Sequence, residues 1–543
     1  MISKKLKIFG GFLLLLAIVS FACASKKGEK LKKEVATENP SKKRPPNVIV
    51  ILTDDQGYAD FSFHNPKEFP ASVEVLTPNL EKLANGGVFF KNGYVANSTC
   101  GPSRSSLLTG RSSSRFQMEE NNNWKNGDTG PLNTEIFLPK IIKEKGYVSG
   151  AFGKWHMGAI TPDLRPIGRG FDYFWGDDDY AKEDDISHGY YKDFKMMKKG
   201  LDIPPCWKSG EYPIPAYGKY LTDAVTDETL SFIKRNKDNP FFAYVAYHAP
   251  HSPFTAKEKT IKRIVAHQPK FQSVYNRLKT KTDMWIKTGN DRMFDHRAYR
   301  KVDDNPKAKK ELTEELRLIY LAMLLKVDDG VGKIMALLED ENLLENTLIY
   351  YLSDNGGALS RPVDFGCVNL PLRSGKGSIY DGGVRVPYVM HWKGTLPAGE
   401  VSDLMVSSMD IFTTTAELAG AKVPADRVID GVNVIPYLIG DKKGEVAHDY
   451  LFFRRHKRSV YSIRVGDEKL VGNTNIKTGK NGRINTNKYP HAEGSLYDIE
   501  HDITELNDIS SQRPDRKAQI QDIYNKNVKV LPLPKAFGES KKE

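Results

Sequence analysis

Cysteine is scarce in this sequence, which has four cysteines in 543 residues. Four are too few for a fold built on disulfide bonds, so a disulfide scaffold is excluded. Long apolar runs are also lacking, because apart from one short run near the start no segment is apolar enough to span a membrane. Hydrophobic residues still make up 39% of the chain and charged residues 27%. That composition excludes a disordered chain, and the length predicts a large globular domain with a smaller one beside it.

The start of the chain is typical of an export signal. Lys4, Lys5 and Lys7 precede the apolar run Ile8–Val19, which is too short for a comfortable membrane span. Residues 20–23 (SFAC) resemble a bacterial lipoprotein cleavage site, with Cys23 as the lipidated residue, although a Ser stands where Leu is usual. We therefore predict a signal peptide over residues 1–23 and an exported cell-envelope lipoprotein, in the periplasm or on the cell surface. A plain signal peptide with secretion is the alternative.

The rest of the chain divides by composition. Residues 24–46 are rich in Lys, poor in apolar residues and end in two prolines, as expected of a flexible tether. We expect a main domain over residues 47–440, a smaller subdomain over 441–535 and a tail over 536–543. A basic insertion, residues 254–310, interrupts the main domain.

Four apolar stretches of the main domain predict buried strands, and each is followed by polar residues. They are Asn47–Thr53, Tyr147–Phe152, Phe241–Tyr247 and Thr347–Ser353, with helical patterns over 78–85, 139–145 and 311–339 between them. This alternation predicts an α/β fold with a large central, mostly parallel sheet flanked by helices. Strand-like pieces over 450–453 and 460–465 and a helical pattern over 513–525 predict a smaller C-terminal α+β subdomain with an antiparallel sheet.

Carboxylates lie at two of the predicted strand ends, where ligands of such sheets bind. Asp54 and Asp55 follow the first strand, and Asp354 and Asn355 follow the last. These side chains offer oxygen ligands, which suit calcium or magnesium rather than zinc. One such pair alone is more typical of a turn or a helix cap. Two pairs after two buried strands predict a metal site.

Cationic side chains follow the other predicted strands. Lys154 and His156 follow the second strand, His248 follows the third, and Lys376 lies in the Gly-punctuated loop Leu372–Gly377. A lone Lys or His is usually a surface or core residue. Beside a hard metal, these cations together predict a site for the ester of a tetrahedral oxyanion.

The most specific motif is Cys100–Arg111 (CGPSRSSLLTGR). It resembles the signature of the type I sulfatases, C-x-P-S-R followed by L-T-G-R, and Pro102 predicts that Cys100 lies at a helix N-terminus. A free thiol in a turn is the alternative. The segments TDDQGYAD, GKWHMG, HAPH, SDNGG, LRSGKGSIYDGGVRVP, IDGVNVIPYL and LYDIEHDITELNDI extend the resemblance over residues 47–510. Two departures are Ala59, where many members have Gly, and the acidic stretch 177–179, which has no counterpart we can align.

The resemblance implies a formylglycine-dependent hydrolase with the fold of the alkaline phosphatase superfamily. It implies that Cys100 is converted to formylglycine (3-oxoalanine), either by a formylglycine-generating enzyme or by an anaerobic sulfatase-maturating enzyme. It further implies Ca²⁺, with Mg²⁺ as the second choice, bound by Asp54, Asp55, Cys100, Asp354 and Asn355.

The resemblance also assigns roles in catalysis. The implied catalytic set is Cys100, Arg104, Lys154, His156, His248 and Lys376. In the implied mechanism, one hydroxyl of hydrated formylglycine at residue 100 attacks sulfur and forms a covalent sulfo-enzyme, while His248, with Lys376 nearby, protonates the leaving oxygen. His156 then takes the proton that allows sulfate to leave. His251 and Arg373 are expected to bind the substrate.

The predicted reaction is hydrolysis of sulfate esters on a sulfated carbohydrate, with release of inorganic sulfate. The substrate would be a polysaccharide or oligosaccharide, such as the algal ulvan or carrageenan. One alternative is a phosphonate or phosphate ester hydrolase of the same superfamily. Another is a non-catalytic lipoprotein that binds sulfated glycans. In each case contact with a membrane is expected only through a lipid anchor or not at all.

The net charge of +12 is unevenly distributed. Residues 1–46 carry 11 Lys and Arg against 3 Asp and Glu, the insertion carries 16 against 6, and the rest of the chain is therefore net −6. This distribution favours a sulfated glycan as partner and makes nucleic acid unexpected. The insertion, with Phe271, Tyr275, Trp285 and Tyr299, is either a solvated surface or a wall that grips the glycan. Arg454 to Arg458 are candidates for a further subsite, and pairing of Cys206 with Cys367 stays open.

Overall fold

The computed structural model describes residues 44–121, 130–158, 162–177, 220–288, 291–296, 305–359, 365–455, 460–473 and 493–532. Predictions that concern Cys23, the tether up to residue 43, residues 178–179, Cys206, Tyr299, residues 456–458 and the tail lie outside these ranges. Within them, no helix combines the length and the apolar character that crossing a membrane requires.

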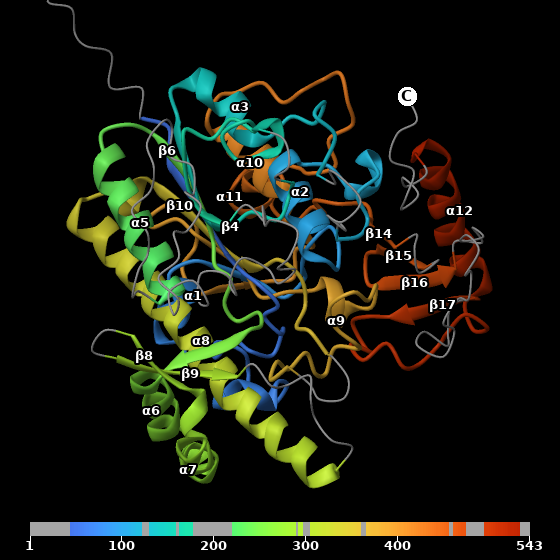
Figure 1. Cartoon of the computed structure of the whole chain (residues 1–543). Helices are drawn as coiled ribbons and strands as arrows, with labels where there is room; N and C mark the ends of the chain where they lie inside the picture. Colours follow the sequence, from blue (N-terminus) through green and yellow to red (C-terminus); the bar gives the residue numbers. More distant parts are fainter. Residues whose placement is uncertain are drawn as a thin grey trace, which may run out of the picture. The chain divides into compact units, whose positions relative to one another are not determined.

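An eight-stranded sheet forms the centre of the described structure (Figure 1). Its strand order is β12-β2-β11-β10-β1-β6-β4-β5, and β10, β1, β6, β4 and β5 are parallel neighbours. The bounds are β1 Asn47–Thr53, β2 Val88–Phe90, β4 Val148–Lys154, β5 Tyr173–Asp177, β6 Phe241–Ala246, β10 Thr347–Ser353, β11 Tyr388–His391 and β12 Glu400–Ser402. Only β11 runs antiparallel to both of its neighbours. The predicted mostly parallel sheet is confirmed.

Strand β1 is buried along its whole length because helices cover both faces of the sheet. Ile49 and Ile51 face a core shared with α1 (Pro78–Asn85), α5 (Leu221–Asn236) and α8 (Pro306–Asp340). Val48, Val50 and Leu52 face a second core shared with α2 (Cys100–Thr109), α3 (Leu138–Ile142) and α10 (Asp410–Leu418), as Figure 1 shows. A strand buried on both faces needs the continuous apolar run from which it was predicted.

Helix α8 is longer than the pattern over 311–339 predicted. It begins at Pro306, directly after Asn305, whose side chain accepts a hydrogen bond from the backbone N–H of Lys307. An Asn cap followed by Pro in the first turn is a strong start signal. The cluster of lysines after Pro306 obscured it, because the apolar stripe begins only at Leu312.

The insertion folds as a three-stranded antiparallel sheet with two helices that pack against α8. Its elements are β7 (Phe254–Lys257), α6 (Glu258–His267), 3₁₀ turns at Pro269–Phe271 and Thr282–Met284, α7 (Gln272–Thr280), β8 (Trp285–Thr288) and β9 (Asp291–His296). Several of its basic residues pair with acidic residues of α8. Arg277 Nε lies 2.8 Å and Lys281 Nζ 2.6 Å from the two carboxylate oxygens of buried Glu315. These pairs give the basic residues a packing role, and grip on a glycan stays a prediction.

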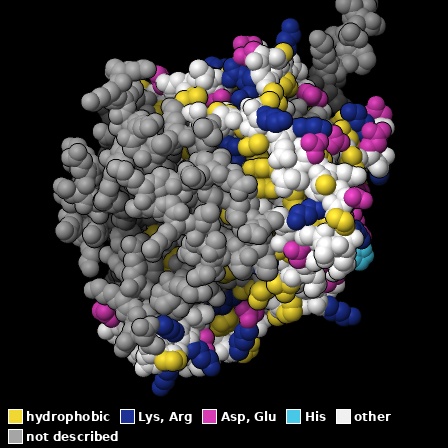
Figure 2. Space-filling view, turned by 90° about the vertical axis from the view of Figure 1, so that its right-hand side faces the viewer, with side chains coloured by type: hydrophobic (Ala, Val, Ile, Leu, Met, Phe, Trp, Pro, Cys, Tyr) yellow, Lys and Arg dark blue, Asp and Glu magenta, His cyan; other side chains and the backbone are white. Residues whose placement is uncertain are grey.

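Charges of both signs also mix on the face shown in Figure 2. There the described Lys and Arg side chains are interspersed with Asp, Glu and apolar side chains rather than gathered into one field. A single-sign field would be needed to attract a polyanion over a long range. This part of the surface therefore gives no support to a broad polyanion-binding face.

The C-terminal part forms the predicted α+β subdomain. Strands β14 (Leu451–Arg455), β15 (Val460–Val465), β16 (Glu468–Asn473) and β17 (Glu493–Asp498) make an antiparallel sheet in chain order. Helix α12 (Pro514–Val530) packs on it, with the ring of Tyr524 stacked 3.5 Å from that of Tyr461. Arg454 and Arg455 are buried and paired with Glu119 and Glu120. These pairs give the two arginines a packing role, and a substrate subsite formed by them stays a prediction.

Smaller elements complete the main domain. Strands β3 (Gly93–Tyr94) and β13 (Val406–Ser407) form a two-stranded parallel sheet. The short helix α9 (Asp381–Val384) lies between β10 and β11 in the sequence, and α11 (Ile435–Ile439) lies between α10 and β14.

Candidate active site

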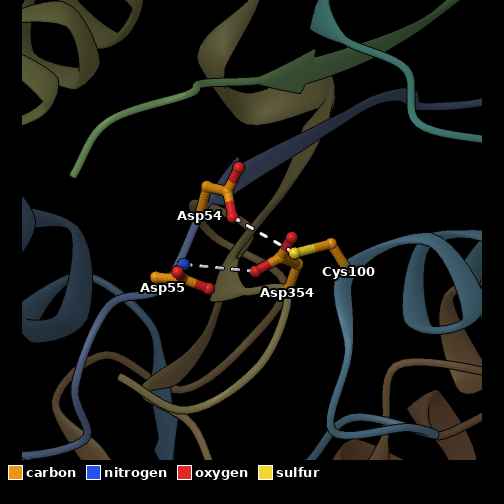
Figure 3. Close-up of side chains that lie close together, drawn as sticks. All are labelled: Asp54, Asp55, Cys100 and Asp354. Atoms are coloured by element: carbon orange, nitrogen blue, oxygen red, sulfur yellow. Dashed lines mark hydrogen bonds between the residues drawn. The ribbon is translucent and has the colours of Figure 1, made fainter. Parts of the chain in front are cut away.

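Three carboxylates and one thiol converge where β1 and β10 end. Asp54 and Asp55 follow β1, Asp354 follows β10, and Cys100 begins α2. One ligand atom from each of the four lies within 4.8 Å of the others, and all four residues are buried (Figure 3). Strands β1 and β10 are paired in parallel up to Thr53 and Ser353, so the residues that follow are brought together by the sheet register. Cys100 Sγ donates to Asp54 Oδ1 at 3.5 Å.

The backbone is unusual at three places around this cluster. Asp55, His156 and Ser374 have φ angles of 61°, 58° and 65°, in the left-handed region that non-glycine residues rarely adopt. At Asp55 this turn directs the backbone N–H toward Asp354, where it donates to Oδ1 at 3.3 Å. Left-handed non-glycine residues cost about 1–3 kcal/mol each and tend to occur at functional sites. Three such residues around the cluster show that the backbone is strained at the ends of these strands.

Glycines allow the loop after β10 to pack against helix α9 and against the loop that carries Lys376. A Cβ on Gly356 would lie 1.8 Å from the carbonyl oxygen of Gly382, and one on Gly375 would lie 2.3 Å from that of Gly357. The backbone N–H of Lys376 donates to the Gly357 carbonyl at 3.0 Å. The loop after β10 and the loop that carries Lys376 are thus in direct backbone contact.

Each carboxylate has its own cation. Lys154 Nζ lies 2.5 Å from Asp54 Oδ2, and Lys376 Nζ lies 2.7 Å and 2.9 Å from the two carboxylate oxygens of Asp55. The side chain of Arg104, on α2, pairs with Asp354 Oδ2 at 2.7 Å. It also donates to the carbonyl of Lys154 at 3.1 Å and to the hydroxyl of Tyr244 at 3.5 Å. Cations this close compensate for the burial of several carboxylates in one place.

Asn355 leaves one oxygen for a ligand. Its Nδ2 donates to Asp55 Oδ1 and to the Gly356 carbonyl, both at 2.8 Å. Its Oδ1 is buried and accepts no hydrogen bond in the described structure. Buried polar atoms are almost always satisfied, so this oxygen, beside three carboxylates, fits a hard divalent cation that prefers oxygen ligands.

The charges of the cluster shift its proton affinities. Burial would raise the pKa of Asp54, but the charges of Lys154, Arg104 and Lys376 lower it well below the usual range. Burial, together with the charge of Asp54, raises the pKa of Asp354 to about 6. Burial and the two carboxylates also raise the pKa of the Cys100 thiol, which stays protonated. An unmodified Cys100 would therefore be a poor nucleophile.

The histidines after β6 are tied to the end of β1. The backbone N–H of Tyr247 donates to the Leu52 carbonyl at 2.8 Å, and that of Asp54 to the Ala249 carbonyl at 3.3 Å. His248 is buried in this segment, and His251 Nε2 lies 3.5 Å from Asp55 Oδ2. Burial lowers the pKa of His251 to about 3.

The structure places Arg373 differently from the other predicted residues. Its guanidinium donates to the Glu505 carbonyl at 2.5 Å and lies 4.1 Å above the ring of Tyr380. It therefore contacts the C-terminal subdomain, and substrate binding by Arg373 stays a prediction. Cys367 Sγ donates to the Ala358 carbonyl at 3.2 Å. The possible partner Cys206 lies outside the described residues, so this pairing is untested.

Sequence reasoning missed one residue that contacts the start of α2. Asn121 Oδ1 accepts the backbone N–H of Gly101 at 2.9 Å, and so satisfies a donor directly beside Cys100. A cap twenty residues after the N–H group that it satisfies has no local signal in the sequence. It could be found only from the folded structure.

Comparisons with known proteins agree with the geometry. Residues 46–421 match the sulfatase family model, and residues 375–531 match the model of the C-terminal region of N-sulphoglucosamine sulphohydrolase. The chain is 32% identical to N-acetylgalactosamine-6-sulfatase of Canis lupus familiaris over 78% of this chain and 71% of that protein. It is 30% identical to the uncharacterized sulfatase YdeN of Escherichia coli K12, over 75% and 68% of the two chains.

A solved structure is similar over nearly the whole chain. It is that of Ps i-CgsB in complex with k-i-k-neocarrahexaose, with a TM-score of 0.70 and 31% sequence identity. The similarity covers 92% of this chain and 96% of that one.

Proposed function

Since the chain belongs to the sulfatase family and is a sulfuric ester hydrolase acting on sulfated sugars, we propose that its substrate is a sulfated oligosaccharide or polysaccharide of the carrageenan class. The similarity to a protein solved with neocarrahexaose supports this substrate class. The observation that carries the proposed hydrolysis itself is the position of Cys100, which begins α2 within the carboxylate cluster. Ulvan and glycosaminoglycans are the substrates to compare.

The proposal includes a modified residue 100 and a bound Ca²⁺, with Mg²⁺ as the second choice. Hydrated formylglycine, a geminal diol, would supply a hydroxyl nucleophile, and a cation held by Asp54, Asp55, Asp354 and Asn355 would lower the pKa of that hydroxyl and act as a Lewis acid for the sulfate group. The unpartnered Oδ1 of Asn355 supports the metal. The raised pKa of the Cys100 thiol supports the need for modification.

The remaining roles belong to side chains of the chain itself. Lys154 and Arg104 fix Asp54 and Asp354 and place positive charge where a sulfate group would lie. His248, with Lys376 nearby, protonates the leaving sugar oxygen, and His156 accepts a proton from the second hydroxyl of the diol, which expels sulfate and regenerates the aldehyde. A sulfate ester on residue 100 is the covalent intermediate of this scheme.

Export and lipidation are part of the same proposal. The lysines and the apolar run before Cys23 support export as a lipoprotein. We expect the chain to take up radioactive palmitate in cells, and Cys23→Ala to abolish that labelling. Unlabelled wild-type protein in the medium would instead support plain secretion.

The test is sulfate release from a panel of carrageenan, ulvan and glycosaminoglycan oligosaccharides, measured by ion chromatography. We expect release from a carrageenan oligosaccharide by the wild-type chain and none by Cys100→Ala. Cys367→Ala is the matched control, because it removes the other described thiol, which lies outside the cluster. Equal release by Cys100→Ala and the wild-type chain would contradict the mechanism.

Two further measurements separate the alternatives. Aryl phosphate and aryl phosphonate, assayed beside the sulfated substrates, test the alternative hydrolase activity. The mass of the peptide that contains residue 100 tests the non-catalytic alternative, which requires an unmodified cysteine there.

A further inference from the structure

Arg455, the last residue of β14, joins the C-terminal sheet to two loops of the main domain. Its Nε donates to Glu120 Oε1 at 2.9 Å, and its Nη2 donates to Glu120 Oε2. Its Nη1 donates to the carbonyl oxygen of Gly377. The arginine side chain is 4% exposed. One buried guanidinium therefore holds Glu120 and Gly377 at the same time.

Both partners are adjacent in sequence to residues that contact the site. Glu120 precedes Asn121, which accepts the backbone N–H of Gly101 beside Cys100. Gly377 follows Lys376, whose ammonium pairs with Asp55. Arg455 thus contacts both the segment whose Asn121 caps the start of α2 and the loop that carries Lys376.

The loop that carries Lys376 also contacts the segment that precedes α2. The backbone N–H of Gly377 donates to the carbonyl of Ser98 at 2.7 Å, two residues before Cys100. Gly377 has a φ angle of 81°, and a Cβ there would lie 2.7 Å from Arg455 Nη1. The close approach of the guanidinium therefore depends on a glycine at this position.

The contacts require arginine rather than a positive charge alone. The planar guanidinium offers Nε and Nη2 to the two oxygens of one carboxylate, while Nη1 points to a different acceptor. A lysine ammonium is a point charge and cannot hold the same fixed arrangement. Buried ion pairs add little to stability but can fix one geometry.

We propose that Arg455 is a positioning residue that sets the place of the Lys376 ammonium relative to residue 100. This inference rests on the proposed function, in which Lys376 assists protonation of the leaving oxygen. A side chain of the C-terminal subdomain then tunes catalysis without contact with the substrate.

The neighbouring residue provides a matched control. Arg454 is as buried as Arg455 and pairs with Glu119 at 2.7 Å, one residue before Glu120. It also donates to the carbonyl of Pro532 at 3.2 Å, in the C-terminal segment. Arg454→Met therefore removes a cation from a buried glutamate of the same segment but leaves the contact with Gly377 in place.

The test is a double-mutant cycle between Arg455→Met and Lys376→Ala, on the substrate that the wild-type chain hydrolyses. We expect Arg455→Met to lower kcat about 10- to 100-fold with a smaller change in KM, because a displacement of about 1 Å can cost that much. In the Lys376→Ala background the same substitution should cost less than about 3-fold. Arg454→Met, compared at equal folded fraction by circular dichroism, should keep kcat within about 3-fold of wild type.

Two outcomes would overturn the inference. One is additivity, in which Arg455→Met costs the same factor with and without Lys376. The other is an equal loss of kcat in Arg454→Met and Arg455→Met. If Arg455→Met does not fold, Arg455→Lys replaces it, since it keeps the charge beside Glu120 and loses the planar fork.

A crystal structure of the variant gives a readout that does not need activity. We expect the Lys376 ammonium to leave Asp55, while the carboxylate cluster keeps its arrangement. An unchanged contact between Lys376 and Asp55 would contradict the inference. Absence of sulfate release by the wild-type chain would instead contradict the proposed function, and the crystal structure would still decide on Arg455.

Discussion

Arg104 donates two hydrogen bonds to one carboxylate oxygen of Asp354, from Nε at 2.9 Å and from Nη2 at 2.7 Å, both to Oδ2. The other oxygen, Oδ1, accepts the backbone N–H of Asp55 at 3.3 Å and faces the cluster, as Figure 3 shows. Helix α2, which carries both Arg104 and Cys100, is thereby locked to the end of β10. The carboxylate cannot rotate without breaking contacts on both of its oxygens.

Arg104→Lys should therefore impair catalysis more than folding. Lysine can replace only one of the two hydrogen bonds, and we expect kcat for sulfate release to fall about 100-fold as Asp354 loses its fixed orientation. Arg115→Lys is the control, because Arg115 pairs with Asp430 through the same fork outside the cluster. Equal kcat values in the two variants would show that the fork at Asp354 has no catalytic importance.

Removal of divalent cations should lower both activity and stability. The three carboxylates repel one another, and a bound cation that the unfolded chain cannot hold shifts the unfolding midpoint upward with its concentration. We expect the midpoint to fall in EDTA, to recover with Ca²⁺, and to lose this dependence in Asn355→Ala. Asn433→Ala, on an asparagine that pairs with Glu417, serves as control. A midpoint that is the same in EDTA and in Ca²⁺ would contradict the metal site.

Gly356→Ala should disrupt the contact between the loop after β10 and helix α9. The added Cβ would lie 1.8 Å from the Gly382 carbonyl, and we expect a loss of about 2–4 kcal/mol in the free energy of unfolding. Gly420→Ala separates this clash from backbone strain, since Gly420 has a φ angle of 67° but open space around it. That control should lose about 1 kcal/mol. Urea unfolding measures both, and a smaller loss in Gly356→Ala than in the control would refute the argument.

The buried pair of His448 and Asp410 should make stability depend on pH. Burial alone would lower the pKa of His448, but Asp410, 2.9 Å away, raises it above its ordinary value. The contribution of the pair is therefore fully present below the unfolded-state pKa of about 6.5 and is lost as pH rises through the higher folded-state value. The stability difference between wild type and His448→Gln should be larger near about pH 5.5 than near about pH 9. Urea unfolding at both values tests this, and a difference that does not vary with pH would contradict it.

Arg277→Met distinguishes the two interpretations of the basic insertion. Glu315 is buried and loses one of its two cations in this variant. We expect a loss of about 1–3 kcal/mol in the free energy of unfolding, with KM for polymeric and small sulfated substrates unchanged. A raised KM for polymer alone, at unchanged stability, would support a glycan-gripping wall instead.

The layout of the site could be predicted from the sequence because its parts follow continuous apolar strands. Asn47–Thr53 and Thr347–Ser353 form the strands that the pattern predicted, and the residues after them meet as expected for parallel neighbours. The metal site was predicted from Asp and Asn side chains after two of the strands, and the oxyanion site from Lys and His side chains after the others.

The supporting contacts could not be predicted, because their partners are distant in sequence. Arg455 and Glu120 are 335 residues apart, and a run of basic residues is typical of a solvated surface. Only the folded structure places the end of β14 against the segment that follows α2. The left-handed turn at Asp55 is likewise absent from local patterns, since Asp adopts it only where the surroundings require it.

The pairing of β1 with β10 has a consequence for the order of events in the life of the chain. Asn47 lies opposite Thr347, three hundred residues later, so the two halves of the carboxylate cluster meet only after most of the polypeptide has been synthesised. Contacts of such long sequence separation form late and slowly. Until then residue 100 has no cluster to enclose it, and under the proposed function this interval would give a maturating enzyme time to act on the nascent chain. Once the sheet has formed, residue 100 would be enclosed, and each molecule would keep either the cysteine or the formylglycine that it then has at this position.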